Sequence, residues 1–123
     1  MTPIWIAKLR VILVHADGRR DEGHIAVGQP YVLGEPPAYG DADPGLNYES
    51  TCPVEITGVW RPEHAPRAPG TLSALVSGIE VLGHMLHAFV SRGGRVLAPE
   101  DGTDVDLKSI FGPLYRPIDA NAP

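Results

Sequence analysis

Apolar and polar positions follow two different periods along this chain, and the period changes near residue 71. Beyond it, apolar residues recur every three or four positions, the spacing of a helix with one side facing a core. They are Leu72, Leu75, Val76, Ile79, Leu82, Leu86, Phe89 and Val90. Thr71 is the expected N-cap and Gly93-Gly94 the expected stop, because glycine adopts left-handed backbone angles at low cost. The pattern therefore predicts one long amphipathic helix.

The region before residue 71 alternates with a period of two, which is typical of strands. Residues 5 to 15 make the first strand, and the turn signal Asp17-Gly18 leads into a second, so the two are predicted to form a hairpin. Residues 48 to 57 make a third strand, in which Pro53 indicates an edge position or a bulge because proline donates no ladder hydrogen bond.

These elements predict an α+β domain with a three- to four-stranded, mainly antiparallel sheet and one long helix packed on one face. Arg95-Val96-Leu97 adds a short last strand, and residues 106 to 111 add one helical turn. We expect a single domain, 1–123, with its core in about 4–98 and a loop, short helix and tail in 99–123. Gly83 is expected to allow close packing of the helix on the sheet. The predicted core is Leu9, Val11, Leu13, Ile25, Val27, Cys52, Val54, Ile56, Leu75, Ile79, Leu82 and Leu86.

Composition narrows the class of protein. Hydrophobic residues make up 43% and charged residues 20%, as in ordinary globular domains, while 14 glycines and 13 prolines predict long loops at 34–47 and 58–70. A single cysteine, Cys52, excludes an internal disulfide and favours the cytoplasm, and in a strand it is expected to be a buried small hydrophobe. The segment at Ile4 is too short for a membrane span and lacks the order of a signal peptide. A net charge of -5 argues against nucleic-acid binding.

One group of residues on the predicted helix has the chemistry of metal ligands. Glu80, His84 and His87 lie four and three positions apart and so share one helix face. Two imidazoles and a carboxylate can bind zinc with an open position for water, which would suit a metal-dependent enzyme. The alternative is a solvated helix face, because no further ligand is evident elsewhere. No cofactor is predicted.

Acidic residues gather in two segments that lack basic ones. We expect Glu35, Asp41 and Asp43 of one loop to join the acids of residues 99 to 106 in a patch that attracts a basic partner. In the second segment the expected partner-binding residues are Asp101, Asp104 and Asp106. They could also chelate calcium, but their order does not match an EF-hand, and an aspartate-rich turn explains them. A merely solubilising role for both segments is the alternative.

Trp60 and Arg61 are residue types that anchor protein interfaces, and both stand in the second loop. A tryptophan that covers the edge of the core is the alternative explanation for Trp60. Both residues are therefore included among the expected partner-binding positions.

The strand Cys52-Pro53-Val54-Glu55-Ile56, the helix after it and the ending Gly93-Gly94-Arg95-Val96-Leu97 resemble a group of small bacterial proteins of unknown function. The resemblance covers about the middle half of the chain and implies a sheet with one helix. It implies no catalytic residue.

The leading hypothesis for function is a non-catalytic protein-binding module, for example a bacterial immunity-type or inhibitor protein. It rests on the lack of a reactive set of residues and on the acidic segments. The rival is an enzyme or metal-binding protein that uses the helix histidines. A third hypothesis is a homodimer held through a second sheet face at Ile4, Ile6, Ile12 and Val14.

Overall fold

The computed structural model describes residues 2–34 and 48–118. Seven strands and one long helix account for most of the regular structure in these residues. In chain order the elements are β1 (Trp5–Val14), β2 (Arg20–Gly28), β3 (Tyr31–Val32), β4 (Glu49–Thr51), β5 (Val54–Ile56), the 3₁₀ turn η1 (Pro62–His64), β6 (Arg67–Pro69), α1 (Thr71–Ser91), β7 (Arg95–Leu97), α2 (Leu107–Phe111) and the 3₁₀ turn η2 (Gly112–Leu114).

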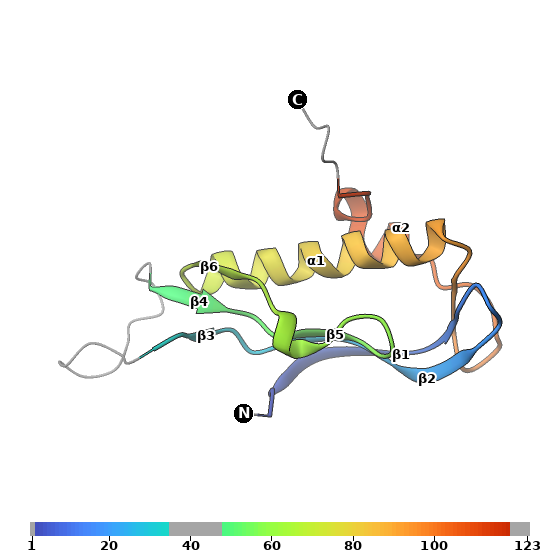
Figure 1. Ribbon diagram of the computed structural model, residues 1–123, viewed down its shortest axis with the longest axis horizontal. Helices are drawn as coiled ribbons and strands as arrows, with labels where there is room; N and C mark the ends of the chain where they lie inside the picture. Colours follow the sequence, from blue (N-terminus) through green and yellow to red (C-terminus); the bar gives the residue numbers. More distant parts are fainter. Residues whose placement is uncertain (1, 35–47, 119–123) are drawn as a thin grey trace.

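The strands form two antiparallel sheets under one helix. The larger sheet has the order β5-β2-β1-β7 and the smaller one β3-β4-β6. Figure 1 shows α1 running along one side of the strands, and it contacts strands of both sheets. The predicted α+β class, the hairpin of β1 with β2 and the long helix are confirmed. The smaller sheet was not predicted, because strands of two or three residues are too short for alternation to show.

The third predicted strand is broken at Pro53. Its first part, β4, belongs to the smaller sheet and its second part, β5, to the larger one. Pro53 lacks an N–H, but its carbonyl accepts from the N–H of Gly28 at 2.7 Å, and the Cys52 thiol donates to the Gly28 carbonyl at 3.3 Å. Proline thus marks the point where one chain segment passes from one sheet to the other.

The ends of α1 lie close to the predicted ones. Gly70, with a φ of 87°, is the N-cap in place of Thr71, because the chain turns sharply there after its N–H pairs with the Tyr48 carbonyl at 2.7 Å. At the other end Gly93 adopts a φ of 98°, so the predicted glycine stop is confirmed. The short strand after it and the helical turn at α2 are confirmed as well.

The core lies between α1 and the larger sheet. Eight of the predicted core residues are buried, namely Val11, Leu13, Ile25, Cys52, Val54, Ile56, Leu82 and Leu86. The prediction that Leu9 is buried is wrong. Its side chain is 39% exposed, because neither helix lies over that part of β1. Val27, Leu75 and Ile79 are half-buried. Residues from β7 and α2 complete the core instead, among them Val96, Leu97 and Leu107.

Two glycines of α1 face different neighbours. A Cβ on Gly78 would lie 3.1 Å from the Cys52 sulfur, so Gly78 provides the close approach to the sheet. A Cβ on Gly83 would lie 2.2 Å from the Leu114 carbonyl oxygen. Gly83 therefore accommodates the C-terminal segment, residues 112–118, and the prediction that it faces the sheet is wrong.

Candidate functional site

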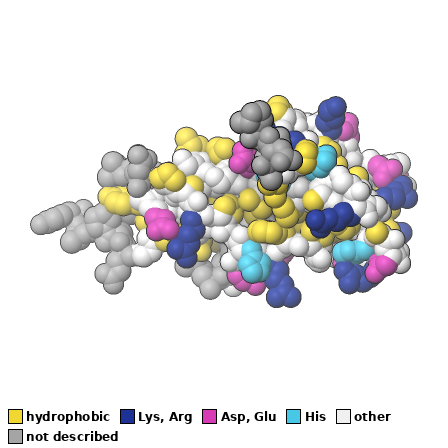
Figure 2. All heavy atoms as spheres, turned by 45° about the horizontal axis from the view of Figure 1, so that its top comes forward, with side chains coloured by type: hydrophobic (Ala, Val, Ile, Leu, Met, Phe, Trp, Pro, Cys, Tyr) yellow, Lys and Arg dark blue, Asp and Glu magenta, His cyan; other side chains and the backbone are white. Residues whose placement is uncertain are grey.

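A pocket of about 380 Å³ opens along one flank of α1, between the helix and the turns that end β1 and β5. We name it the Trp60 pocket. Its walls are formed by His15, Ala16, Val59, Trp60, Met85, Ala88, Phe89, Arg92 and Gly94. Figure 2 shows hydrophobic side chains gathered in the middle of the visible face, with basic, acidic and histidine side chains around them. The lining residues make the Trp60 pocket a mainly apolar hollow, with His15 and Arg92 as its polar members.

Local structure places the aromatic walls. Trp60 follows a tight turn at Gly58, whose φ is 76°, and its backbone bonds on both sides with Ile56 at 2.9 and 3.0 Å. The indole consequently stands beside the core rather than on an open loop. On α1, Met85 and Phe89 are four positions apart, so their side chains share the helix face that lines the pocket.

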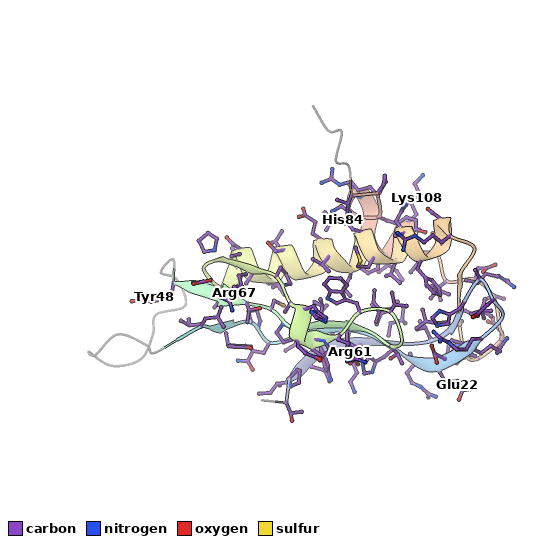
Figure 3. All side chains as sticks on the ribbon, viewed as in Figure 1. Glu22, Tyr48, Arg61, Arg67, His84 and Lys108 are labelled. Carbon is purple, nitrogen blue, oxygen red and sulfur yellow. The ribbon has the colours of Figure 1, made fainter. Side chains whose placement is uncertain are left out.

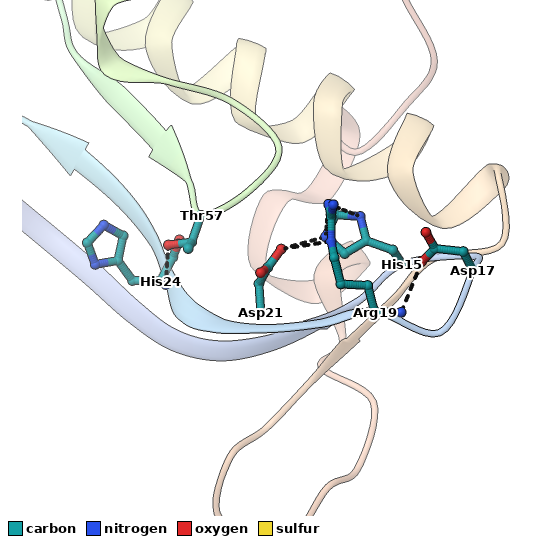
Figure 4. Close-up of polar contacts among 6 residues, drawn as sticks. All are labelled: His15, Asp17, Arg19, Asp21, His24 and Thr57. Atoms are coloured by element: carbon teal, nitrogen blue, oxygen red, sulfur yellow. Dashed lines mark hydrogen bonds and ion pairs between the residues drawn. The ribbon is translucent and has the colours of Figure 1, made fainter.

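Beside the pocket, a polar network closes the β1–β2 turn (Figure 4). The His15 Nε2 lies 2.7 Å from Asp21 Oδ2, and one nitrogen of the Arg19 guanidinium lies 3.1 Å from His15 Nε2 and 3.3 Å from Nδ1. Asp21 and Arg19 thus both contact the imidazole edge. The imidazole also meets the Phe89 ring edge-on, with the ring centroids 5.2 Å apart. The orientation of the imidazole is therefore fixed by Asp21, Arg19 and Phe89 together.

The polar groups around the Trp60 pocket are donors. The Arg92 guanidinium has no hydrogen-bond or ion-pair partner in residues 2–34 and 48–118. Within the same ranges the Trp60 indole N–H is buried without an acceptor. No aspartate or glutamate lines the pocket in the described part of the chain. Because the indole N–H is buried, Arg92 is the donor that an incoming group can reach, and the site favours an apolar group with acceptor or anionic oxygens at its rim.

The acidic residues expected to bind a partner make local contacts where the structure describes them. Asp101 accepts from the backbone N–H and the hydroxyl of Thr103, and these hydrogen bonds hold the pKa of its carboxyl below the usual value. Asp104 pairs with Arg95 at 3.1 Å.

Asp106 caps α2. It accepts from the Ser109 hydroxyl at 2.7 Å and from the Ser109 N–H at 3.1 Å, and these bonds lower the pKa of its carboxyl. Glu35, Asp41 and Asp43 lie outside the described residues. Three of the expected acidic positions thus stabilise a turn, an ion pair and a helix cap.

Glu80, His84 and His87 do not meet in a ligand set. His84 Nδ1 lies 2.8 Å from the Arg116 carbonyl oxygen, and Figure 3 shows His84 on the side of α1 where the C-terminal segment runs. The His87 ring meets the Tyr115 ring at 5.1 Å between centroids. Across 2–34 and 48–118, no group of three or more histidine, cysteine, aspartate or glutamate side chains is arranged to hold a metal ion. The two histidines instead dock the C-terminal segment on α1.

Trp60 is the sequence-predicted residue that the structure places in the pocket, and Arg61 is exposed just beyond it. His15 and Arg92 were missed. Arg92 carried a signal, since it is the last charged residue before the glycine stop. His15 ends the alternating pattern of the first strand, which gave no indication of its neighbours.

Comparisons with family models, curated proteins and solved structures found no match for this chain. By length and composition α1 could cross a membrane, but a core helix passes the same test, and α1 packs against strands of both sheets. In this structure α1 is the apolar core helix of a small domain.

Proposed function

We propose that the protein is a non-catalytic protein-binding module that receives an apolar, acidic segment of its partner in the Trp60 pocket. The observation that carries the proposal is the pairing of aromatic walls with the exposed guanidinium of Arg92, which has no partner in the described residues. Tryptophan and arginine are among the residue types that dominate binding energy at protein interfaces, and methionine is enriched in their composition.

The polar network beside the pocket supports binding rather than catalysis. His15 is held between Asp21 and Arg19, so it stabilises a turn and presents its ring to Phe89. A rigid wall is an advantage in an interface because little side-chain freedom is lost on binding. An immunity-type or inhibitor protein of a bacterial cytoplasm would need such a preformed surface.

The positive charge at the pocket rim indicates the charge of the partner segment. Arg92 at the rim and Arg61 nearby favour acidic residues around the inserted apolar side chain. The basic partner expected from the acidic segments would use another surface.

The test is affinity capture from a lysate of the source organism with three forms of the protein. Wild type and Lys108→Glu are expected to recover the same protein, because Lys108 lies on α2 outside the pocket. Arg92→Glu carries the same change of charge at the rim and is expected to weaken its binding at least tenfold. Equal binding of the recovered protein to all three forms, or recovery of none, would contradict the proposal.

A further inference from the structure

One half of β1 is exposed on both of its faces. From Ile6 to Arg10 five consecutive residues are exposed, whereas the next three are buried. Alternation predicts that every second residue of a strand with one covered face is buried. Ile6, at 54% exposed, and Leu9, at 39%, are apolar side chains left in this open stretch, which we name the β1 edge.

The pairing of β1 shows why the edge is open. On one side β2 pairs with the strand along most of its length, while on the other side β7 pairs only with Ile12, Leu13 and Val14. The chain then leaves the sheet through a turn at Pro99, closed by a bond of 2.9 Å from the Gly102 N–H to the Ala98 carbonyl. Among the described strands, none occupies the position beside residues 6 to 10.

The register identifies the backbone groups that face this position. The even residues of β2 form their backbone hydrogen bonds on the side of β5. The Gly28 N–H donates to the Pro53 carbonyl, and the His24 carbonyl accepts from the Thr57 N–H. The odd residues of β2 therefore face β1, and they are paired with odd residues of β1, such as Ile25 with Leu9. It follows that Lys8 and Arg10 point their N–H and C=O groups outward.

The side chains at the β1 edge define what it can pair with. Lys8 and Arg10 share one face of the sheet and line a hollow of about 370 Å³ together with His24 and a single carboxylate, that of Glu22. The nearby Glu55 is engaged by a hydrogen bond with His24. Opposite-charge pairs across neighbouring strands are stabilising, and like charges placed opposite each other are destabilising.

We propose that the β1 edge takes up an extended segment of another protein as an added strand, with acidic residues opposite Lys8 and Arg10 and aliphatic residues beside Leu9. Main-chain hydrogen bonds would supply affinity and the alternating side chains specificity. The site is separate from the Trp60 pocket and does not depend on it.

A second copy of this chain fits the edge less well. Antiparallel registers that pair Lys8 with Lys8 or with Arg10 of the other copy place like charges opposite each other, which is unfavourable, and a register that pairs Lys8 with Ile6 leaves both lysines without an acidic partner. Charged residues on an edge are a known protection against such self-pairing. The dimer expected from Ile4, Ile6, Ile12 and Val14 also loses support, since Ile12 is buried and Val14 half-buried.

The probe is the peptide acetyl-Thr-Val-Glu-Val-Glu-Val-Thr-amide, titrated into the whole protein and followed by NMR. We expect the exchange of the Lys8 and Arg10 amide protons to slow at least tenfold. The Ala7 and Leu9 amides, already bonded to β2, serve as the internal control and should not change. A matched peptide with lysine in place of glutamate should bind at least tenfold more weakly.

The double variant Lys8→Glu/Arg10→Glu completes the test. Both positions are exposed, so the fold should be retained, and the variant should now prefer the lysine peptide. Equal binding of the two peptides, or shifts that centre on residues of the Trp60 pocket, would overturn the proposal. So would slow exchange at Lys8 and Arg10 that depends on protein concentration alone, because it would assign the edge to a second copy.

Discussion

The two halves of β1 have the same kind of sequence and different surroundings. Leu9 and Leu13 are both leucines at odd positions of one strand, yet Leu13 is fully buried and Leu9 is 39% exposed. Leu13 lies where β7 completes the sheet. Burial of a strand residue is thus decided by the elements that reach it, and alternation shows only which residues could be buried.

The largest effect is expected from truncating the two leucines. Leu13→Ala should lower the free energy of unfolding by about 2–5 kcal/mol, because it opens a cavity in the core. Leu9→Ala should cost no more than about 1 kcal/mol, since much of that side chain already contacts water. Urea unfolding of both variants measures the difference. Equal losses would show that Leu9 is covered in solution and would remove the basis for an open edge.

A smaller effect is expected where the C-terminal segment covers α1. Gly83→Ala places a Cβ against the Leu114 carbonyl and should destabilise the protein by about 1–3 kcal/mol, although alanine is the better helix former. The segment should also become sensitive to protease, as its bond to His84 is lost. Ser73→Ala, at an exposed position of α1, is the control and should not be destabilising. An unchanged protease pattern in Gly83→Ala would argue against the docking.

The rate of thiol alkylation distinguishes a buried position from an exposed one. Burial raises the pKa of Cys52 to about 11, so its reaction with iodoacetamide at pH 8 should be slow in the folded protein. A thiol placed by Leu9→Cys, in a Cys52→Ala background, should react at the rate of a free cysteine.

The pH dependence of stability has a defined sign at Cys52. Its folded pKa lies above the unfolded value of 9.0, so the contribution to stability is fully present below pH 9 and is lost as the pH rises toward 11. The Cys52→Ala variant should lack this part of the alkaline loss. If Cys52 in the folded wild type reacts as fast as the exposed thiol, β4 and β5 must open readily.

Much of the fold was predictable because it depends on local patterns. The hairpin, the helix and its glycine stop, and the strand at Arg95 all have signals within a few residues. The break at Pro53 was indicated, but its consequence, a change of sheet, depends on Gly28 across the hairpin. Trp60 was predicted by residue type alone.

The candidate site was less predictable because its residues are far apart in sequence. His15 and Arg92 reach the Trp60 pocket from the hairpin turn and the end of α1, and no spacing rule connects them. The helix histidines had the spacing of ligands, but their neighbours are Arg116 and Tyr115, from a segment whose packing had no periodic signal. The open β1 edge follows from the length of β7, which only the register revealed.

The smallest effect on stability is expected from a proline at an outward-facing position of β1. Lys8→Pro removes an N–H that has no strand partner among the described residues, so it should cost less than about 1 kcal/mol. Leu9→Pro removes an N–H bonded to β2 and should cost about 3 kcal/mol or more, which makes it the matched control.

The Lys8→Pro variant should nevertheless bind the acidic peptide at least tenfold more weakly, because one ladder bond and one charge are lost together. A Lys8→Ala variant, which removes the charge alone, should retain part of the affinity. Unfolding midpoints that fall equally for both proline variants would mean that residue 8 is already paired on its outer side.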